Sequence, residues 1–168
     1  IILNNISGYL ESKLLSYLVN LHTGDRAIYF CRHGESEFNV KGLIGGDSNL
    51  SDKGRKFSVA LSKFFLSEFK NYSKSDEIIV DDTLKINKPK LYCSTLKRTI
   101  ETSKIVQENT NNLFKDVYSK KILDEIDSGL RDGVSYKYIE TNFPEEFEER
   151  NKDKLNYRYP RGESYMDV

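Results

Sequence analysis

Hydrophobic residues recur along the chain at a spacing of three to four positions in two places, and each place predicts a helix. Leucines follow this spacing through residues 9–21, and Gly24 ends the pattern. A longer helix is expected after Ser51, because serine caps helix N-termini well. Its apolar face is expected to consist of Phe57, Ala60, Leu61, Phe64, Phe65 and Phe69.

Three shorter apolar runs predict strands, at residues 27–31, 90–94 and 120–126. The polar stretch 71–90 between two of them reads as a surface insertion. Strands that alternate with helices are typical of a layered α/β fold with a mainly parallel sheet. The pattern therefore predicts this class of fold.

Three more helices are predicted between and after these strands. One covers residues 96–109, with Ser94 or Thr95 as its cap. Two short helices are expected to begin after Ser135 and at Pro144, because these residue types favour helix starts.

Composition indicates one soluble domain and offers no charge imbalance that would attract a large partner. The 168 residues are 38% hydrophobic, and Lys+Arg and Asp+Glu number 26 each, so neither nucleic acid nor a membrane is an expected partner. Cys31 and Cys93 are expected to be buried free thiols, as in a reducing cytoplasmic compartment. A start at Ile1 suggests a piece of a longer polypeptide.

Polar side chains follow each predicted strand, where ligands of parallel sheets bind. Arg32 and His33 follow the first strand, Arg98 opens the helix after the second, and Glu125 ends the third. A histidine can attack phosphorus, arginines can neutralise a phosphoryl group, and a glutamate can protonate the leaving oxygen. Free N–H groups at the helix start near Arg98 would add to the pull on an anion. The sequence therefore favours one phosphoryl-transfer site over a surface arginine–histidine pair.

Neither a metal ion nor another cofactor is expected at this site. His22 and His33 are the only histidines, and no spacing typical of metal ligands occurs. His22 has no chemical companions nearby in the sequence and is interpreted as a structural residue.

The motif RHGE, at residues 32–35, resembles the signature of the histidine phosphatase (phosphoglycerate mutase-like) superfamily. Within it, the chain is similar to the fructose-2,6-bisphosphatase domain of bifunctional enzymes that also carry a 6-phosphofructo-2-kinase. The matching stretches are IYFCRHGESEFN, IGGDSNLSDKG, STLKRTIET, ILDEIDSG and RYPRGESY. The resemblance implies a three-layer fold, with helices on both faces of a mainly parallel sheet.

The resemblance also implies a role for each matching residue. His33 would take the 2-phosphoryl group of fructose 2,6-bisphosphate, and Glu125 would act first as acid and then as base. Phosphate would be held by Arg32, Asn39 and Arg98, and Gly45 would let the backbone approach the substrate. The sugar and its 6-phosphate would contact Tyr136, Arg150, Lys154 and Tyr165, with Arg150 and Lys154 on one helical face.

Residues 1–25 resemble the end of a kinase domain, which implies that ATP binds elsewhere in a parent polypeptide and that residues 26–168 form the phosphatase domain. The family has a second active-site histidine beyond the position of Val168, so the resemblance implies a domain truncated at its C-terminus. Residues 130–135 depart from the family pattern. Two alternatives stay open: a phosphoglycerate mutase or broad sugar phosphatase, and a non-catalytic module that binds phosphosugars.

Overall fold

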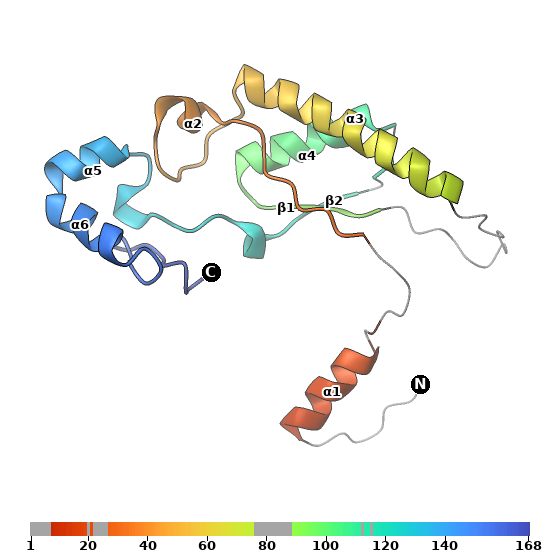
Figure 1. Ribbon diagram of the computed structural model, residues 1–168, viewed down its shortest axis with the longest axis horizontal. Coiled ribbons are helices and arrows are strands. Elements are labelled where there is room, and N and C mark those ends of the chain that lie inside the picture. The colour runs from red at the N-terminus through yellow and green to blue at the C-terminus, as the bar shows by residue number, and fades with distance from the viewer. Residues whose placement is uncertain (1–7, 20, 22–26, 76–88, 112, 115) are drawn as a thin grey trace. The chain divides into compact units, whose positions relative to one another are not determined.

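The computed structural model of the chain describes residues 8–19, 21, 27–75, 89–111, 113–114 and 116–168 (Figure 1). It divides into two compact units, Ile1–Cys31 and Arg32–Val168, which are described separately. No helix in the described part of the chain is long and apolar enough to cross a membrane.

The first unit contains helix α1 (Tyr9–Val19), as the leucine spacing predicts, and the side chains of Leu10, Leu14 and Leu18 are exposed. The predicted helix stop at Gly24 lies outside the described residues. The strand predicted at residues 27–31 is wrong, because these described residues have no strand assignment. An apolar run becomes a strand only when a neighbouring backbone completes its hydrogen-bond ladder. Cys31 is also exposed, against expectation, whereas Cys93 is buried and both are free thiols.

The second unit alternates helices with two strands. Its elements are α2 (Glu37–Lys41), α3 (Asp52–Ser75), β1 (Leu91–Cys93), α4 (Lys97–Asn109), β2 (Val117–Ser119), the 3-10 turns η1 (Lys121–Leu123) and η2 (Gly129–Arg131), α5 (Tyr136–Asn142) and α6 (Pro144–Lys152). β1 and β2 pair in parallel, with Leu91 opposite Val117 and Cys93 opposite Ser119. The α/β class expected from the pattern is therefore confirmed.

The third strand is predicted at residues 120–126, but the observed strand β2 begins three residues earlier, at Val117. Lys120 donates its N–H to the carbonyl of Cys93 (2.8 Å) and so closes the ladder, because β1 ends there. The chain then tightens into η1, which leaves Ile122 exposed. The predicted insertion at 71–90 also begins later, since α3 continues to Ser75, and residues 76–88 lie outside the described part.

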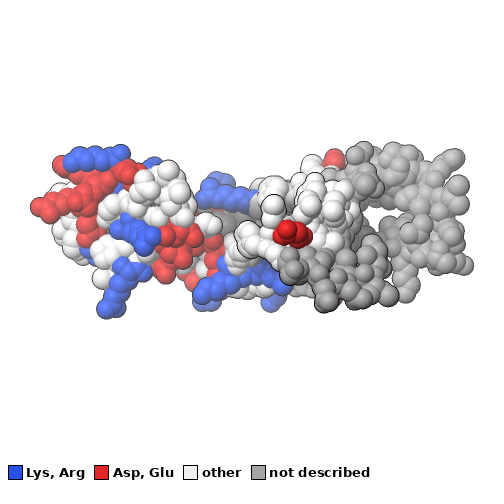
Figure 2. Space-filling model, turned by 90° about the horizontal axis from the view of Figure 1, so that it is seen from below, with Lys and Arg blue, Asp and Glu red and all other residues white. Residues whose placement is uncertain are grey.

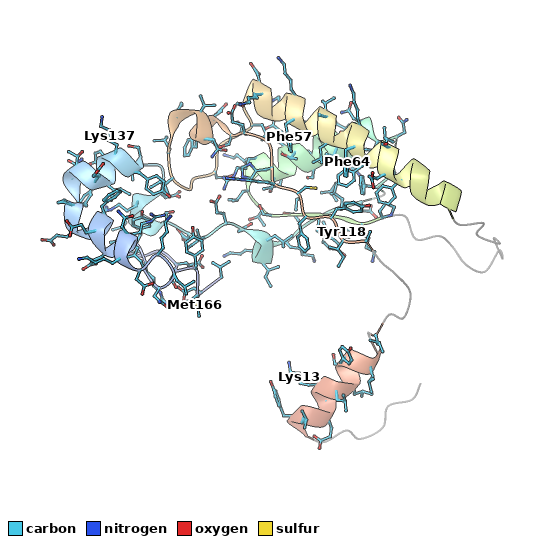
Figure 3. All side chains as sticks on the ribbon, in the orientation of Figure 1. Lys13, Phe57, Phe64, Tyr118, Lys137 and Met166 are labelled. Carbon is cyan, nitrogen blue, oxygen red and sulfur yellow. The ribbon has the colours of Figure 1, made fainter. Side chains whose placement is uncertain are left out.

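The core lies between α3 and α4, against the Leu91 face of the strands. Phe65, Val106 and Phe114 form its buried centre, and the rings of Phe65 and Phe114 meet edge to face at 5.5 Å. On the other face of the strands, Tyr92 and Tyr118 stack at 5.2 Å, and Figure 3 shows Tyr118 pointing away from α3. This packing holds the start of α4, and therefore Arg98, beside the end of β1.

The prediction is wrong for three of the six residues assigned to the apolar face of α3, because Phe57, Ala60 and Phe64 are exposed. The buried stripe instead includes Ser58 and Ser62, whose hydroxyls donate to the carbonyls of Gly54 and Ser58 at 2.9 and 2.8 Å. Small side chains that satisfy their own hydrogen bonds let α4 approach closely, and hydrophobicity alone does not reveal them.

Most helix starts agree with the sequence. Ser51 accepts a hydrogen bond from the N–H of Gly54 (3.1 Å), Ser135 accepts one from Tyr138 (3.1 Å), and Pro144 opens α6. The expected side-chain cap of α4 is wrong, because its N-cap residue is Leu96 and makes no such bond.

Candidate active site

Arg98 lies at the centre of the candidate site and joins three segments that are distant in sequence. Its side chain is only 4% exposed. The Nε atom donates to Nε2 of His33 (3.1 Å), Nη1 to the carbonyl of Gly46 (2.6 Å), and Nη2 to Oε2 of Glu125 (2.6 Å). The planar guanidinium can serve three partners at once because its donors form a rigid fork.

The hydrogen bonds of His33 favour one neutral tautomer of its imidazole. Nδ1 lies 2.6 Å from the carbonyl oxygen of Gly34, which can only accept, so the ring proton belongs on Nδ1. Nε2 then carries the free lone pair, which receives the hydrogen bond from Arg98. A neutral Nε2 is the atom that a nucleophilic histidine needs.

The surroundings of His33 also lower its pKa. Burial is the largest cause, and the positive charges of Arg98 and Arg32 act in the same direction. The bond to Gly34 and the charge of Glu125 oppose this shift. The imidazole is therefore held in its neutral form to a lower pH than an ordinary histidine.

We expect His33 to titrate below the ordinary histidine value of about 6.5. As the pH falls through that value, the Nε2 lone pair remains available, and it is lost only when the pH falls below the lowered pKa of His33. An NMR titration of the ring resonances measures this, and His22→Gln assigns them because the chain has only two histidines. A pKa at or above the ordinary value would contradict the environment described.

The backbone around His33 is held by α2, α3 and α4. The N–H of Gly34 donates to the hydroxyl of Thr102 on α4 (3.2 Å). A Cβ atom on Gly34 would lie 2.4 Å from the carbonyl oxygen of Gly54, so only glycine fits there. Ser36 caps α2, and Asn39 completes the capping box, with its side-chain oxygen accepting from the N–H of Ser36 (3.0 Å).

The loop that contains Gly42, Gly45 and Gly46 approaches a carboxylate that the sequence did not single out. Gly45 has a φ of +59°, and a Cβ there would lie 2.0 Å from Oδ1 of Asp132. The same oxygen accepts a hydrogen bond from the N–H of Gly46 (2.6 Å). Asp132 belongs to residues 130–135, which depart from the family pattern. Its contact with the loop at Gly45 and Gly46 is therefore seen only in the structure.

The expectation that the start of α4 offers free N–H groups is wrong in part. Oδ1 of Asp47 accepts from the N–H of Lys97 (2.6 Å), and the N–H of Leu96 donates to the hydroxyl of Ser94 (3.2 Å). Helix N-termini attract carboxylates as well as phosphates, and here a carboxylate of the chain occupies that place. These two N–H groups are therefore not free to bind an anion, and the positive charge at this place comes from the Arg98 side chain.

A second cluster lies on α5 and α6. Nη2 of Arg150 donates to the hydroxyl of Tyr136 (3.1 Å), and the guanidinium lies 4.8 Å from the Tyr136 ring centre and 5.9 Å from that of Tyr159. The Tyr159 hydroxyl is buried and lacks a hydrogen-bond partner among the described residues. The sequence analysis missed Tyr159, since one tyrosine among 11 carries no distinguishing signal.

Lys154 and Tyr165 are exposed, and none of the described contacts joins them to Arg150. The expectation that Arg150 and Lys154 share a helical face is wrong, because α6 ends at Lys152. Arg150 itself is held through α6, where Glu146 binds Arg131 with both oxygens.

The Arg98 site opens into a cleft of about 420 Å³. Its lining includes Gly45, Gly46, Arg98, Lys121, Glu125 and Asp132. Figure 2 shows one face of the molecule, on which acidic and basic side chains are interleaved at the end that carries α5 and α6. Among the described residues, no group of three or more histidine, cysteine or carboxylate side chains could hold a metal ion.

The fold and this site define an α/β protein in which a buried arginine just after a parallel strand donates to a histidine from a distant segment. Residues 28–168 match the histidine phosphatase superfamily (branch 1). The chain belongs to that superfamily.

Curated relatives match nearly the whole chain. Human 6-phosphofructo-2-kinase/fructose-2,6-bisphosphatase 4 is 40% identical over 99% of this chain and 31% of its own length. The bifunctional protein of Arabidopsis thaliana is 44% identical over 98% of this chain and 20% of its own length. A Schizosaccharomyces pombe protein named probable fructose-2,6-bisphosphatase is 42% identical over 100% of this chain and 36% of its own length. The chain thus spans between 20% and 36% of the length of these relatives, and the resemblance seen in its sequence is confirmed.

Solved structures agree on the fold. Bacillus stearothermophilus YhfR is 28% identical, with a TM-score of 0.59 over 81% of this chain and 58% of its own. A mycobacterial glucosyl-3-phosphoglycerate phosphatase is 21% identical, with a TM-score of 0.60 over 80% of this chain and 55% of its own. The phosphoglycerate mutase-like fold expected from the sequence is therefore confirmed.

Proposed function

We propose that the protein hydrolyses the 2-phosphate of fructose 2,6-bisphosphate, releasing fructose 6-phosphate and phosphate. The observation that carries this proposal is the hydrogen bond from Arg98 Nε to Nε2 of His33 (3.1 Å), with Nδ1 of the same ring held by Gly34. A neutral nucleophile beside a buried cation is the arrangement that phosphoryl transfer to histidine requires.

In the first step, Nε2 of His33 forms a bond to phosphorus while the bond from phosphorus to the sugar O2 breaks. Arg98 turns its donors from Nε2 and Glu125 to the phosphoryl oxygens, together with Arg32 and the amide of Asn39. Glu125, which takes up a proton from solvent once Arg98 has turned away, delivers it to O2, so that C2 of the departing fructose 6-phosphate carries a neutral hydroxyl group.

In the second step, water attacks phosphorus and the bond to His33 breaks. Glu125, now a carboxylate, takes a proton from the water. The imidazole returns to its neutral form and orthophosphate leaves. The proton that Glu125 gave in the first step is thus restored, and no metal ion enters either step.

The choice of substrate is supported by the names of the relatives and by the second cluster. Arg150 and Tyr136 present donors that suit the 6-phosphate, and Lys154 and Tyr165 would join them when the sugar binds. The proposed partners are this small sugar bisphosphate and a kinase domain of the parent polypeptide, where ATP binds. The location in the cytoplasm and the domain boundary between residues 25 and 26 stay predictions.

The test is to incubate fructose 2,6-bisphosphate, labelled at the 2-phosphate, with residues 1–168 and with the protein at its natural full length. We expect acid-labile label on protein and release of fructose 6-phosphate. Faster turnover of phosphoglycerates would favour a mutase or broad phosphatase. Binding of fructose 6-phosphate without any labelled protein would favour a non-catalytic module.

A further inference from the structure

The residue proposed as acid and base lies on an irregular segment. Glu125 is placed between η1 and η2, where the chain has no helix or strand, and its side chain is 52% exposed. Its ion pair with Arg98 cannot fix its position during the reaction, because Arg98 must turn to the phosphate. Another contact has to hold this segment against α4.

Asp124 and Thr95 make that contact. Oδ1 of Asp124 accepts the backbone N–H of Thr95 (2.6 Å), and Oδ2 accepts the Thr95 hydroxyl (2.6 Å). Two hydrogen bonds between the same two residues fix orientation as well as distance, as in other bidentate pairs. Thr95 lies three residues before Arg98, and Asp124 immediately precedes Glu125. The pair therefore joins the same two segments as the ion pair between Arg98 and Glu125.

Both ends of this contact are anchored. Thr95 lies in the short turn between β1 and α4, where the Ser94 hydroxyl accepts from the N–H of Leu96 (3.2 Å). On the other side of Glu125, the N–H of Asp127 donates to Oε2 of Glu163 (3.0 Å), and the N–H of Glu163 donates to the Asp127 carbonyl (2.8 Å). The Glu125 segment is thus held from two sides, and Asp124 provides the side next to Arg98.

We propose that Asp124 is a positioning residue for the reaction: by binding Thr95 through both of its oxygens, it keeps the Glu125 carboxyl within reach of the leaving oxygen when Arg98 turns to phosphate. This rests on the proposed function. A proton donor that shifts by about 1 Å can cost about 100-fold in rate, whereas substrate binding depends on other residues.

Two substitutions at Asp124 separate positioning from a general loss of structure. Asp124→Ala removes both bonds, and water can replace them at this partly exposed place, so the chain should still fold. We expect kcat to fall about 30- to 100-fold with KM changed less than about threefold. Asp124→Asn keeps both bonds, since its oxygen accepts from the N–H of Thr95 and its NH₂ donates to the hydroxyl. Its kcat should stay within about threefold of wild type.

Matched variants sharpen the comparison. Thr95→Val keeps the backbone N–H and loses only the hydroxyl bond, so its kcat should lie between those of the two Asp124 variants. Asp52→Ala removes a carboxylate that is 95% exposed on α3 and should leave kcat unchanged. If Asp124 acts through Glu125, then Asp124→Ala should cost nothing further in the background of Glu125→Gln. An equal loss in both backgrounds would overturn the proposal.

Amide hydrogen exchange tests the same contact without activity. The N–H of Asp127 reports on the order of the Glu125 segment, and we expect its exchange to quicken in Asp124→Ala but not in Asp124→Asn. Unchanged exchange, or an unchanged kcat, in Asp124→Ala would overturn the positioning role. If wild-type protein neither hydrolyses the bisphosphate nor takes label, the proposed function and the positioning of its acid fail together. Quickened exchange would then show only that the contact orders this segment.

Discussion

His33→Ala is expected to abolish the phosphorylated intermediate and nearly all turnover. The side chain is the proposed nucleophile, and removing a nucleophile can cost on the order of 10⁶ in kcat. Nε2 is prepared by two contacts at once, the Nδ1 bond to Gly34 at 2.6 Å and the donor of Arg98 at 3.1 Å. Alanine removes the first contact and leaves Arg98 without this acceptor.

The measurement is quench-flow trapping of acid-labile phosphate, followed by steady-state kinetics. His22→Ala is the matched control, because it replaces the only other histidine and should leave both signals intact. Alkaline-stable, acid-labile label on His33→Ala would show that another residue accepts the phosphoryl group. The assignment of His33 as nucleophile would then fall.

Arg98→Met should have the second largest effect. Arg98 is the buried cation of the site, and losing an arginine that stabilises a transferring phosphoryl group can cost about 10³- to 10⁵-fold in kcat. Methionine fills much of the same space but carries no charge. Arg98→Lys should recover little of the loss, because an ammonium group cannot serve Gly46, Glu125 and the phosphate in the geometry of the fork.

Affinity for orthophosphate, measured by calorimetry, should fall with kcat in both variants, since the same guanidinium binds the ground-state anion. Arg55→Met is the matched control: it also removes an arginine paired with a glutamate, through Nε and Glu101 at 2.7 Å, but outside the cleft. Urea unfolding of each variant separates lost chemistry from lost stability. Full phosphate affinity in Arg98→Met would exclude Arg98 as the phosphate ligand.

Local signals in the sequence located the helices more reliably than the strands. Ser51, Ser135 and Pro144 mark helix starts because capping depends on residues a few positions apart, and the structure agrees at all three. The runs at 27–31 and 120–126 failed as strands, because a strand requires a partner from elsewhere in the chain. Periodicity also misjudged α3, where Ser58 and Ser62 take buried positions that phenylalanines were expected to hold.

The sequence by itself determined the class of fold, the superfamily, and the meeting of His33, Arg98 and Glu125, because chemically distinctive residues mark where ligands of α/β proteins bind, even though the run before His33 is not a strand. Only the tertiary structure decided what surrounds them. Contacts of Asp47, Asp124 and Asp132 with backbone N–H groups join segments 29 to 86 positions apart. An aspartate that binds a distant amide looks, in sequence, like any solvated aspartate. Its function depends on which backbone the fold brings within 3 Å or so of it, and that is a property of the folded chain.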